Sequence, residues 1–199
     1  MNKLYYRYGA MGSSKTAQAL MIKFNYEQKG FRVFLFKPKY DNRCVEDGKA
    51  YVASRIGLKS ECIEFACDDN FQDLCRTYDI LNVEKVKNSV IVVDECQFMT
   101  KEQVEQLKDI SEYLPVLCFG LLTNYKTELF EGSKRLIELA DSFSEIKSIC
   151  KCGRKATVNA RFLNGEIMTD GNEIEIGGDE QYEGMCYSCY KKKLNNKKD

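Results

Sequence analysis

The strongest constraint on the fold of this chain is a run of small residues near the N-terminus that ends in Lys15-Thr16. An aromatic segment ending at Tyr8 precedes the run, and a helical pattern of apolar residues follows it at once. Small residues let a loop turn its backbone N–H groups inward, and a helix N-terminus behind the loop favours an anion. A lysine can then reach the outer phosphates of a nucleotide, and a hydroxyl can bind magnesium. The run predicts a phosphate-binding loop made of Gly9, Ala10, Met11, Gly12, Ser13, Ser14, Lys15 and Thr16.

The loop departs from the usual pattern, G-x-x-x-x-G-K-[ST], at the position before the lysine, where Ser14 replaces glycine. Serine resists a positive φ, so a loop that needs one at this position carries strain of roughly 1 kcal/mol. Gly12 can shift the place where the loop makes its sharp turn. The alternative interpretation is a strand-to-helix turn of small residues that binds no ligand.

Composition limits the classes of protein to which the chain can belong. Its 199 residues suit one ordinary domain with a small appendage, and 44% hydrophobic residues with only two prolines indicate a folded protein. A net charge of zero, from 30 basic and 30 acidic residues, argues against a nucleic-acid coat protein or a membrane-surface binder. No apolar run approaches the roughly 20 residues that span a bilayer, and the first predicted strand leaves no room for a signal peptide. We therefore expect a cytoplasmic protein that holds its substrate in a site.

The sequence contains no histidine, and this restricts both catalysis and metal binding. Any general base must be a carboxylate, cysteine, lysine or tyrosine, and any zinc site must depend on thiolates. Four of the ten cysteines form two close pairs near the C-terminus, Cys150 with Cys152 and Cys186 with Cys189. Four thiolates in two pairs can close a tetrahedral zinc site of the structural type, and the alternative is free or redox-active thiols.

The order of the first elements predicts an α/β fold. A helix over residues 16–29 stops at Gly30, and a buried strand over 31–38 follows it. Strand, loop, helix and strand form a βαβ unit, which predicts a P-loop (RecA-like) parallel sheet flanked by helices, with the loop at the carboxyl ends of the strands. We expect the polar connection over 39–60 to be a mobile loop beside the nucleotide. Within it, Arg43 and Arg55 either steady phosphate charge or lie on a solvated surface.

The remaining elements continue this domain and then leave it. We predict strands over residues 60–67, 90–93, 115–122 and 145–150, and helices over 70–81, 100–113 and 131–142. Thr100 is the expected N-cap of its helix, with Gln103 completing a capping box. Beyond residue 149 the composition changes to cysteine, glycine and β-branched residues. The predicted domains are a P-loop ATP-binding α/β domain over 1–149, a zinc-binding β domain over 150–190, and a basic, partly disordered tail over 191–199.

Two carboxylates, Asp94 and Glu95, follow a strand of four consecutive β-branched residues. Such a strand is typical of the buried centre of a parallel sheet, so its carboxyl end lies near the phosphate loop. Asp94 is then placed to hold a magnesium ion, and Glu95 to accept a proton from an attacking hydroxyl. The alternative is a strand end without a function.

Apolar side chains are expected in the loops at the same edge of the sheet. They can line a flat pocket for a nucleotide base, or they can only cover the core. These residues are Phe98, Leu121, Tyr125 and Phe130.

Taken together, the motifs resemble those of the type II thymidine kinases, the thymidine kinase 1-like family, over nearly the whole chain. The motifs are the phosphate loop, Val-Asp-Glu-Cys-Gln-Phe, Gly-Leu-Leu-Thr-Asn-Tyr, Ile-Cys-Lys-Cys-Gly-Arg-Lys-Ala, and Ile-Gly-Gly-Asp-Glu-Gln-Tyr before the last cysteine pair. The resemblance implies a parallel-sheet ATP domain and a small zinc-bound domain whose long loop, the lasso, closes over thymidine.

The resemblance also implies roles for individual residues. The phosphate loop and Asp94, Glu95, Cys96 and Gln97 would bind ATP, with Thr16 and Asp94 on magnesium and Glu95 as the general base. The cysteines Cys150, Cys152, Cys186 and Cys189 would hold zinc. The residues implied to surround thymidine are Met11, Phe98, Leu121, Tyr125, Phe130 and the lasso residues Ile174, Glu175, Ile176, Gly177, Gly178 and Tyr182.

The activity implied by the resemblance is transfer of the ATP γ-phosphate to the 5′-hydroxyl of thymidine, and also of deoxyuridine, in pyrimidine nucleoside salvage. A homotetramer and feedback by thymidine triphosphate are implied as well. Two rivals remain open: a P-loop ATPase, and a zinc-ribbon protein that binds nucleic acid and uses nucleotide as a switch. The neutral net charge weakens the second rival.

Overall fold

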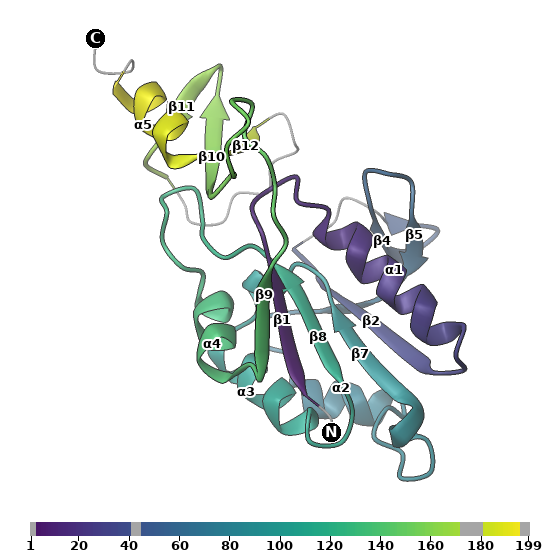
Figure 1. The fold of residues 1–199 in the computed structure, drawn as a ribbon. Coiled ribbons are helices and arrows are strands. Elements are labelled where there is room, and N and C mark those ends of the chain that lie inside the picture. The colour runs from purple at the N-terminus through teal and green to yellow at the C-terminus, as the bar shows by residue number, and fades with distance from the viewer. Residues whose placement is uncertain (1–2, 41–44, 172–180, 196–199) are drawn as a thin grey trace.

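The computed structural model describes residues 3–40, 45–171 and 181–195. Its centre is a six-stranded sheet in the order β6-β2-β7-β8-β1-β9, and every neighbouring pair is parallel (Figure 1). The predicted α/β fold with a parallel sheet is therefore confirmed. The strands are β1 Leu4–Tyr8, β2 Arg32–Pro38, β6 Ile63–Phe65, β7 Ser89–Val93, β8 Val116–Gly120 and β9 Ser142–Glu145.

Helices cover both faces of this sheet because the side chains of each strand alternate between two apolar clusters. On β7, Val90 and Val92 pack with α1, whereas Ile91 and Val93 pack with the helices of the opposite face. The amphipathic pattern of each helix supplies the matching apolar side. The helices are α1 Lys15–Glu27 on one face, and α2 Phe71–Thr77, α3 Lys101–Ile110 and α4 Glu131–Leu139 on the other. Short 3-10 turns are η1 Val86–Asn88 and η2 Cys96–Phe98.

The helix ends follow local rules, and the largest difference from the prediction is at the end of α2. The capping box of Thr100 and Gln103 is present at the start of α3. Helix α2, predicted over residues 70–81, ends at Thr77 instead. Asp79 adopts a left-handed conformation with φ 52°, and the N–H of Ile80 turns back to the carbonyl of Cys75 at 2.8 Å. This left-handed residue ends the helix before the predicted boundary.

The connection after β2, expected to be a mobile loop, contains a small antiparallel sheet instead. Its strands are β3 Val45–Glu46, β4 Lys49–Ala53 and β5 Lys59–Glu61. Asp47-Gly48 has positive φ at both residues, 50° and 75°, which is the turn that a two-residue hairpin requires. The strand predicted over 60–67 is consequently divided, with β5 in the hairpin and β6 in the main sheet.

The last strand of the main sheet lies earlier than predicted. We expected it over residues 145–150, but β9 is Ser142–Glu145 and the preceding helix α4 already ends at Leu139. Asp141 fixes this register, because its carboxylate accepts from the N–H of Leu4 at 2.8 Å and its own N–H donates to the Leu4 carbonyl at 2.9 Å. The sheet edge therefore ends level with Tyr8, where β1 itself ends.

A smaller unit follows beyond the carboxyl ends of the main strands (Figure 1). Three antiparallel strands in the order β11-β10-β12 pack with helix α5, and this unit is called the cysteine module below. Helix α5 continues to Asn195, so residues 191–195 of the expected disordered tail are helical. The elements are β10 Val158–Leu163, β11 Glu166–Met168, β12 Tyr182–Met185 and α5 Tyr187–Asn195. None of the helices in residues 3–40, 45–171 and 181–195 is long and apolar enough to cross a membrane.

Candidate active site

The predicted phosphate loop connects β1 to α1 at the carboxyl edge of the parallel sheet. Gly9 must be glycine because a Cβ at this position would lie 2.4 Å from the carbonyl oxygen of Ile146 and 2.4 Å from Oγ of Ser13. Gly12 adopts φ 76°, the left-handed region that favours glycine. The close approach at Gly9 and the turn at Gly12 bring the loop back to the first residue of the helix, where an anion is favoured.

Ser14 does adopt the strained conformation that its position in the motif suggested. Its φ is 61° and its ψ is 23°, which is left-handed, and it stands immediately before the first residue of α1. Its hydroxyl donates to the carbonyl of Ser13 at 2.6 Å. The loop therefore keeps the left-handed geometry in spite of the Cβ, at a cost on the order of 1 kcal/mol.

Lys15 folds back over the loop instead of pointing into solvent. Its Nζ donates to the carbonyl oxygens of Gly9 at 3.1 Å and Ala10 at 3.0 Å, and to Oγ of Ser13 at 3.3 Å. Burial lowers the pKa of Lys15, and the nearby carboxylates of Glu95 and Asp94 oppose that shift. The ammonium is therefore held at the centre of the loop, where the outer phosphates of a nucleotide would lie.

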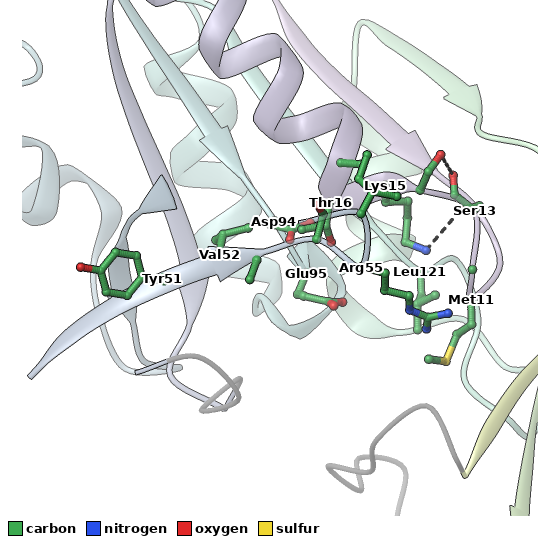
Figure 2. Close-up of a pocket in the computed structure, with 16 residues that line it drawn as sticks. Met11, Ser13, Lys15, Thr16, Tyr51, Val52, Arg55, Asp94, Glu95 and Leu121 are labelled. Atoms are coloured by element: carbon green, nitrogen blue, oxygen red, sulfur yellow. Dashed lines mark hydrogen bonds between the residues drawn. The ribbon is translucent and has the colours of Figure 1, made fainter. Parts of the chain in front are cut away.

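Asp94 and Thr16 lie next to each other, near Lys15, in the lining of the same cavity (Figure 2). Asp94 is only 3% exposed, and the Thr16 hydroxyl lies close to its carboxylate. Burial and the adjacent charge of Glu95 raise the pKa of Asp94 to about 7, although the Thr16 hydroxyl favours the charged form. A carboxylate and a hydroxyl next to a phosphate loop are the oxygen ligands that magnesium prefers, so these residues fit that ion.

Glu95 is positioned by its neighbours on two elements. It has φ 51° and ψ 38°, and the side-chain amide of Gln97 donates to its Oε2 at 2.7 Å. The carbonyl of the same Gln97 side chain accepts from the N–H of Leu121 at 3.0 Å. Gly120 leaves room for this arrangement, because a Cβ there would lie 2.5 Å from Oε1 of Gln97. The Glu95 carboxylate is thus fixed in orientation by the Gln97 side chain, which is itself held by Leu121, the residue after β8.

These residues surround one cavity of about 410 Å³, a size suited to a small-molecule site (Figure 2). Met11, Ser13, Lys15, Asp94, Glu95 and Leu121 all line the cavity, so the phosphate loop and the acidic pair face the same space. Cys96, expected to contact ATP, is not part of that lining and belongs to the buried core below. The remaining residues of the lining are Gly12, Ser14, Thr16, Ala17, Tyr51, Val52, Ala53, Ser54, Arg55 and Ile56.

Arg55 reaches this cavity from the turn between β4 and β5. The turn is closed by hydrogen bonds between Ser54 and Leu58. The N–H of Ser54 donates to the Leu58 carbonyl at 2.8 Å, and the N–H of Leu58 donates to the Ser54 hydroxyl. A Cβ at Gly12 would lie 3.9 Å from a terminal nitrogen of Arg55, and the charge of Arg55 contributes to the lowered pKa of Lys15. Of the two arginines whose roles were left open, Arg55 therefore belongs to the site, and Arg43 lies outside the described residues.

The apolar residues predicted to surround a base are only partly brought together. Leu121 joins Met11 in the cavity, whereas Phe98 packs edge-on against Phe130 with ring centroids 5.8 Å apart. Tyr125 is 2% exposed, and the guanidinium carbon of Arg161 lies over its ring, 5.4 Å from the ring centroid. Tyr182 is half-buried. The predicted lasso residues Ile174, Glu175, Ile176, Gly177 and Gly178 lie outside the described residues.

The four predicted metal ligands of the cysteine module converge. The Sγ atoms of Cys150, Cys152, Cys186 and Cys189 all lie within 4.8 Å of one another, and no other group of this kind occurs in the described part of the chain. A tetrahedral zinc ion with Zn–S bonds of 2.3 Å requires sulfurs about 3.8 Å apart, so the cluster fits. Backbone N–H groups of Cys152 and Cys186 lower the pKa of Cys150 to about 6, which favours the thiolate that a metal binds.

Two residues that contact the phosphate loop from the cysteine module were not predicted from the sequence, and neither were several residues of the cavity lining. Asn159 is 3% exposed, and its Oδ1 accepts from the N–H of Met11 at 2.8 Å. Gly184 lies against the carbonyl of Met11. The available signal for Asn159 was a single amide between two apolar residues, Val158 and Ala160.

Comparisons with known proteins show which proteins this chain resembles. The model of the family described as thymidine kinase matches residues 2–190. A thymidine kinase of Rhodopirellula baltica is 39% identical over 98% of this chain and 90% of its own length. Thymidine kinases of Photorhabdus laumondii, at 38% identity over 100% and 99% of the two chains, and Vibrio vulnificus, at 39% over 98% and 99%, are equally similar.

Among solved structures, 77% of this chain matches 43% of the Legionella pneumophila ATPase DotB, with 17% identity and a TM-score of 0.36. That likeness is too weak to carry information about function. The family match extends from the phosphate loop through the cysteine cluster, and the relatives align over almost their full lengths. This chain therefore belongs to the thymidine kinase family.

Proposed function

We propose that this protein is an ATP-dependent thymidine kinase that transfers the γ-phosphate of ATP to the 5′-hydroxyl of thymidine and also of deoxyuridine. The observation that carries the proposal is the shared cavity, in which Glu95 faces the phosphate loop and its Lys15. Family membership supplies the nucleoside, since the relatives are named for thymidine. Transfer of phosphate requires alignment and neutralisation of charge, and both are properties of this site.

The phosphate loop and Lys15 would hold the triphosphate. The Nζ of Lys15 donates to the carbonyl oxygens of Gly9 and Ala10 and to Oγ of Ser13, which holds the ammonium inside the loop that would surround the phosphates. Thr16 and Asp94 would hold a magnesium ion, which neutralises charge on the phosphates when it is bound. The position of Thr16 beside Asp94 in the cavity lining supports this assignment, because the two ligand oxygens lie together.

Glu95 would accept the proton of the nucleoside 5′-hydroxyl. Gln97 holds the Glu95 carboxylate by a bond of 2.7 Å, which limits its rotation and leaves it directed at the cavity. A carboxylate is the expected base in a chain without histidine. Removal of the proton late in transfer balances the reaction, because the hydroxyl oxygen bonds to the γ-phosphorus as ADP leaves.

The nucleoside would lie toward the cysteine module. Met11 and Leu121 already border the cavity on that side. We assign to the same pocket the remaining residues implied by the family, which are Phe98, Tyr125, Phe130, Tyr182 and the lasso residues 174–178. Zinc in the four-cysteine cluster would be structural, since four thiolates leave no position open for a substrate.

Several broader features are proposed from the family alone. They are a cytoplasmic location, a homotetramer, feedback by thymidine triphosphate, and a division into an ATP domain over residues 1–149 and a zinc domain over 150–190. Each can be checked independently, the assembly by sedimentation and the feedback by adding thymidine triphosphate to the assay.

Replacement of Glu95 tests the proposed mechanism. We expect Glu95→Gln to lower the rate of thymidine phosphorylation by roughly 10²–10⁴-fold, the range for a lost general base, while ATP still binds. Glu102→Gln, on the exposed first turn of α3, is the matched control and should behave as the wild type. The assay follows thymidine monophosphate and ADP separately across the pyrimidine nucleosides.

The same assay separates the kinase from the rival P-loop ATPase. ADP formed without nucleoside, at the rate seen with nucleoside, would identify an ATPase. Near wild-type transfer by Glu95→Gln would show that another group accepts the proton.

A further inference from the structure

The cysteine module contacts the phosphate loop through a buried amide. Asn159 on β10 is 3% exposed; its Oδ1 accepts from the N–H of Met11 at 2.8 Å, and its Nδ2 donates to the carbonyl of Thr123 at 2.8 Å. One side chain thus joins β10, the phosphate loop and the loop after β8. A carboxamide suits this position because it has both a donor and an acceptor.

A second contact reaches the other side of Met11. In the register between β10 and β12, Asn159 lies opposite Gly184. A Cβ at Gly184 would lie 2.5 Å from the carbonyl oxygen of Met11, so the strand approaches the loop as closely as only glycine permits. The backbone φ of Gly184 does not require glycine, so the close approach is the reason for this residue. The N–H and the carbonyl of Met11 are therefore both contacted by one pair of opposed residues.

This pair is closely connected to the metal cluster. Gly184 is followed by Met185 and Cys186, and Met185 pairs with Val158, next to Asn159. Val158, Met185, Cys150 and Cys186 share one buried cluster. Cys186, one of the four clustered cysteines, thus follows the residue in contact with Met11 by only two positions along the chain.

We propose that Asn159 and Gly184 are positioning residues, which hold the Met11 peptide and so set the conformation of the phosphate loop for transfer. The cysteine module is then part of the scaffold of the ATP site as well as a cover for the nucleoside. The effect on catalysis rests on the proposed kinase function, whereas the contact itself can be tested without it.

The test compares Asn159→Ala, Gly184→Ala and the double variant. Asn159→Ala leaves the Met11 N–H and the Thr123 carbonyl without their partner, and Gly184→Ala forces β12 away from Met11. We expect each to lower kcat for thymidine by about ten- to a hundredfold, since small displacements at a phosphoryl-transfer site are costly. The double variant should lose less than the product of the two, because both changes release the same peptide.

Matched controls lie beside each position. Thr157→Ala precedes Asn159 and removes an exposed side chain, and Glu183→Ala removes an exposed ion pair with Lys151 next to Gly184. Both controls should retain wild-type kcat. Zinc content, measured on every variant, should stay equal to that of the wild type, so that a lost metal cannot explain a lost rate.

A readout independent of catalysis is hydrogen exchange of the Met11 amide. We expect this amide to be protected in the wild type and the two controls, and to exchange faster in Asn159→Ala while zinc remains bound. Unchanged exchange at Met11 in Asn159→Ala would overturn the proposal. Loss of rate in the double variant equal to the product of the single losses would also overturn it. If the wild type lacked kinase activity, the proposed function would fail while the exchange measurement still decided the contact.

Discussion

The parallel sheet and the cysteine module are stabilised in different ways. The sheet buries apolar side chains on both faces, with one cluster under α1 and a larger one under α2, α3 and α4. The module has one small cluster, and two of its seven buried members are the cysteines Cys150 and Cys186. A unit of this size rarely supplies enough apolar burial by itself, and a structural metal commonly makes up the difference. The comparison indicates a sheet that is stabilised by apolar burial, and a module with a small apolar core and four cysteines that could hold a metal ion.

The largest expected effect is that of removing the metal. Chelation of zinc, or Cys189→Ser, should raise amide hydrogen exchange throughout β10 and β12, because the fold of the module depends on the bound ion. Amides of β7 and β8 should stay protected, since their burial does not involve the four cysteines of the module. Exchange measured by mass spectrometry before and after chelation gives the result. Equal deprotection of β7 would mean that the two regions do not differ as described.

A cavity made in the apolar core of the sheet should destabilise the sheet and leave the cysteine module unaffected. Ile91 is fully buried between β7 and the helices, so Ile91→Ala should lower the free energy of unfolding of the sheet by about 2–5 kcal/mol. Urea unfolding measures this change, with Met21→Ala, at a position 46% exposed on α1, as the control. Zinc content should be unaffected. If Ile91→Ala lost zinc as well as sheet stability, the two regions would unfold as one cooperative unit.

The hairpin of β4 and β5 offers a smaller effect confined to the site. We expect Arg55→Ala to lower kcat/KM for ATP by about tenfold, since a charged hydrogen-bonding group facing the phosphates would be lost. Lys49→Ala, which removes an exposed ion pair with Glu61 on the same hairpin, is the control. Steady-state kinetics with varied ATP concentration distinguishes the Arg55→Ala variant from the Lys49→Ala control. An Arg55→Ala enzyme that behaves like the Lys49→Ala enzyme would remove Arg55 from the ATP site.

The smallest effect is expected at Ser14. Ser14→Gly relieves left-handed strain of about 1 kcal/mol but also makes the unfolded chain more flexible, so thermal stability should change little. Activity should stay within about tenfold of the wild type or rise, as a barrier change of that size allows. Melting curves and initial rates are the measurements. A large loss of rate would give the serine hydroxyl a role beyond its bond to Ser13.

The two regions also differ in how far the sequence predicts them. The phosphate loop, β7 and the pair Asp94-Glu95 were predicted because local patterns determine them, and so were the four cysteines. The hairpin of β3 and β4 was missed although Asp47-Gly48 is a local turn signal. The position of β9 was wrong because Asp141 fixes it through contacts with Leu4, far away in sequence. The contact of Asn159 with Met11 depends on how two separate units meet, and no local pattern encodes it.

The left-handed backbone of Glu95 has a consequence for the chemistry of the cavity. Successive side chains of a regular strand point to opposite sides, so two adjacent carboxylates at a strand end would normally be separated by the sheet. At φ 51° the chain leaves that alternation directly after Asp94, and both acids border the same hollow. The proposed metal ligand Asp94 and the proposed proton acceptor Glu95 can thus be neighbours in sequence and still act in one reaction. A single unfavourable backbone torsion, at Glu95, makes this possible.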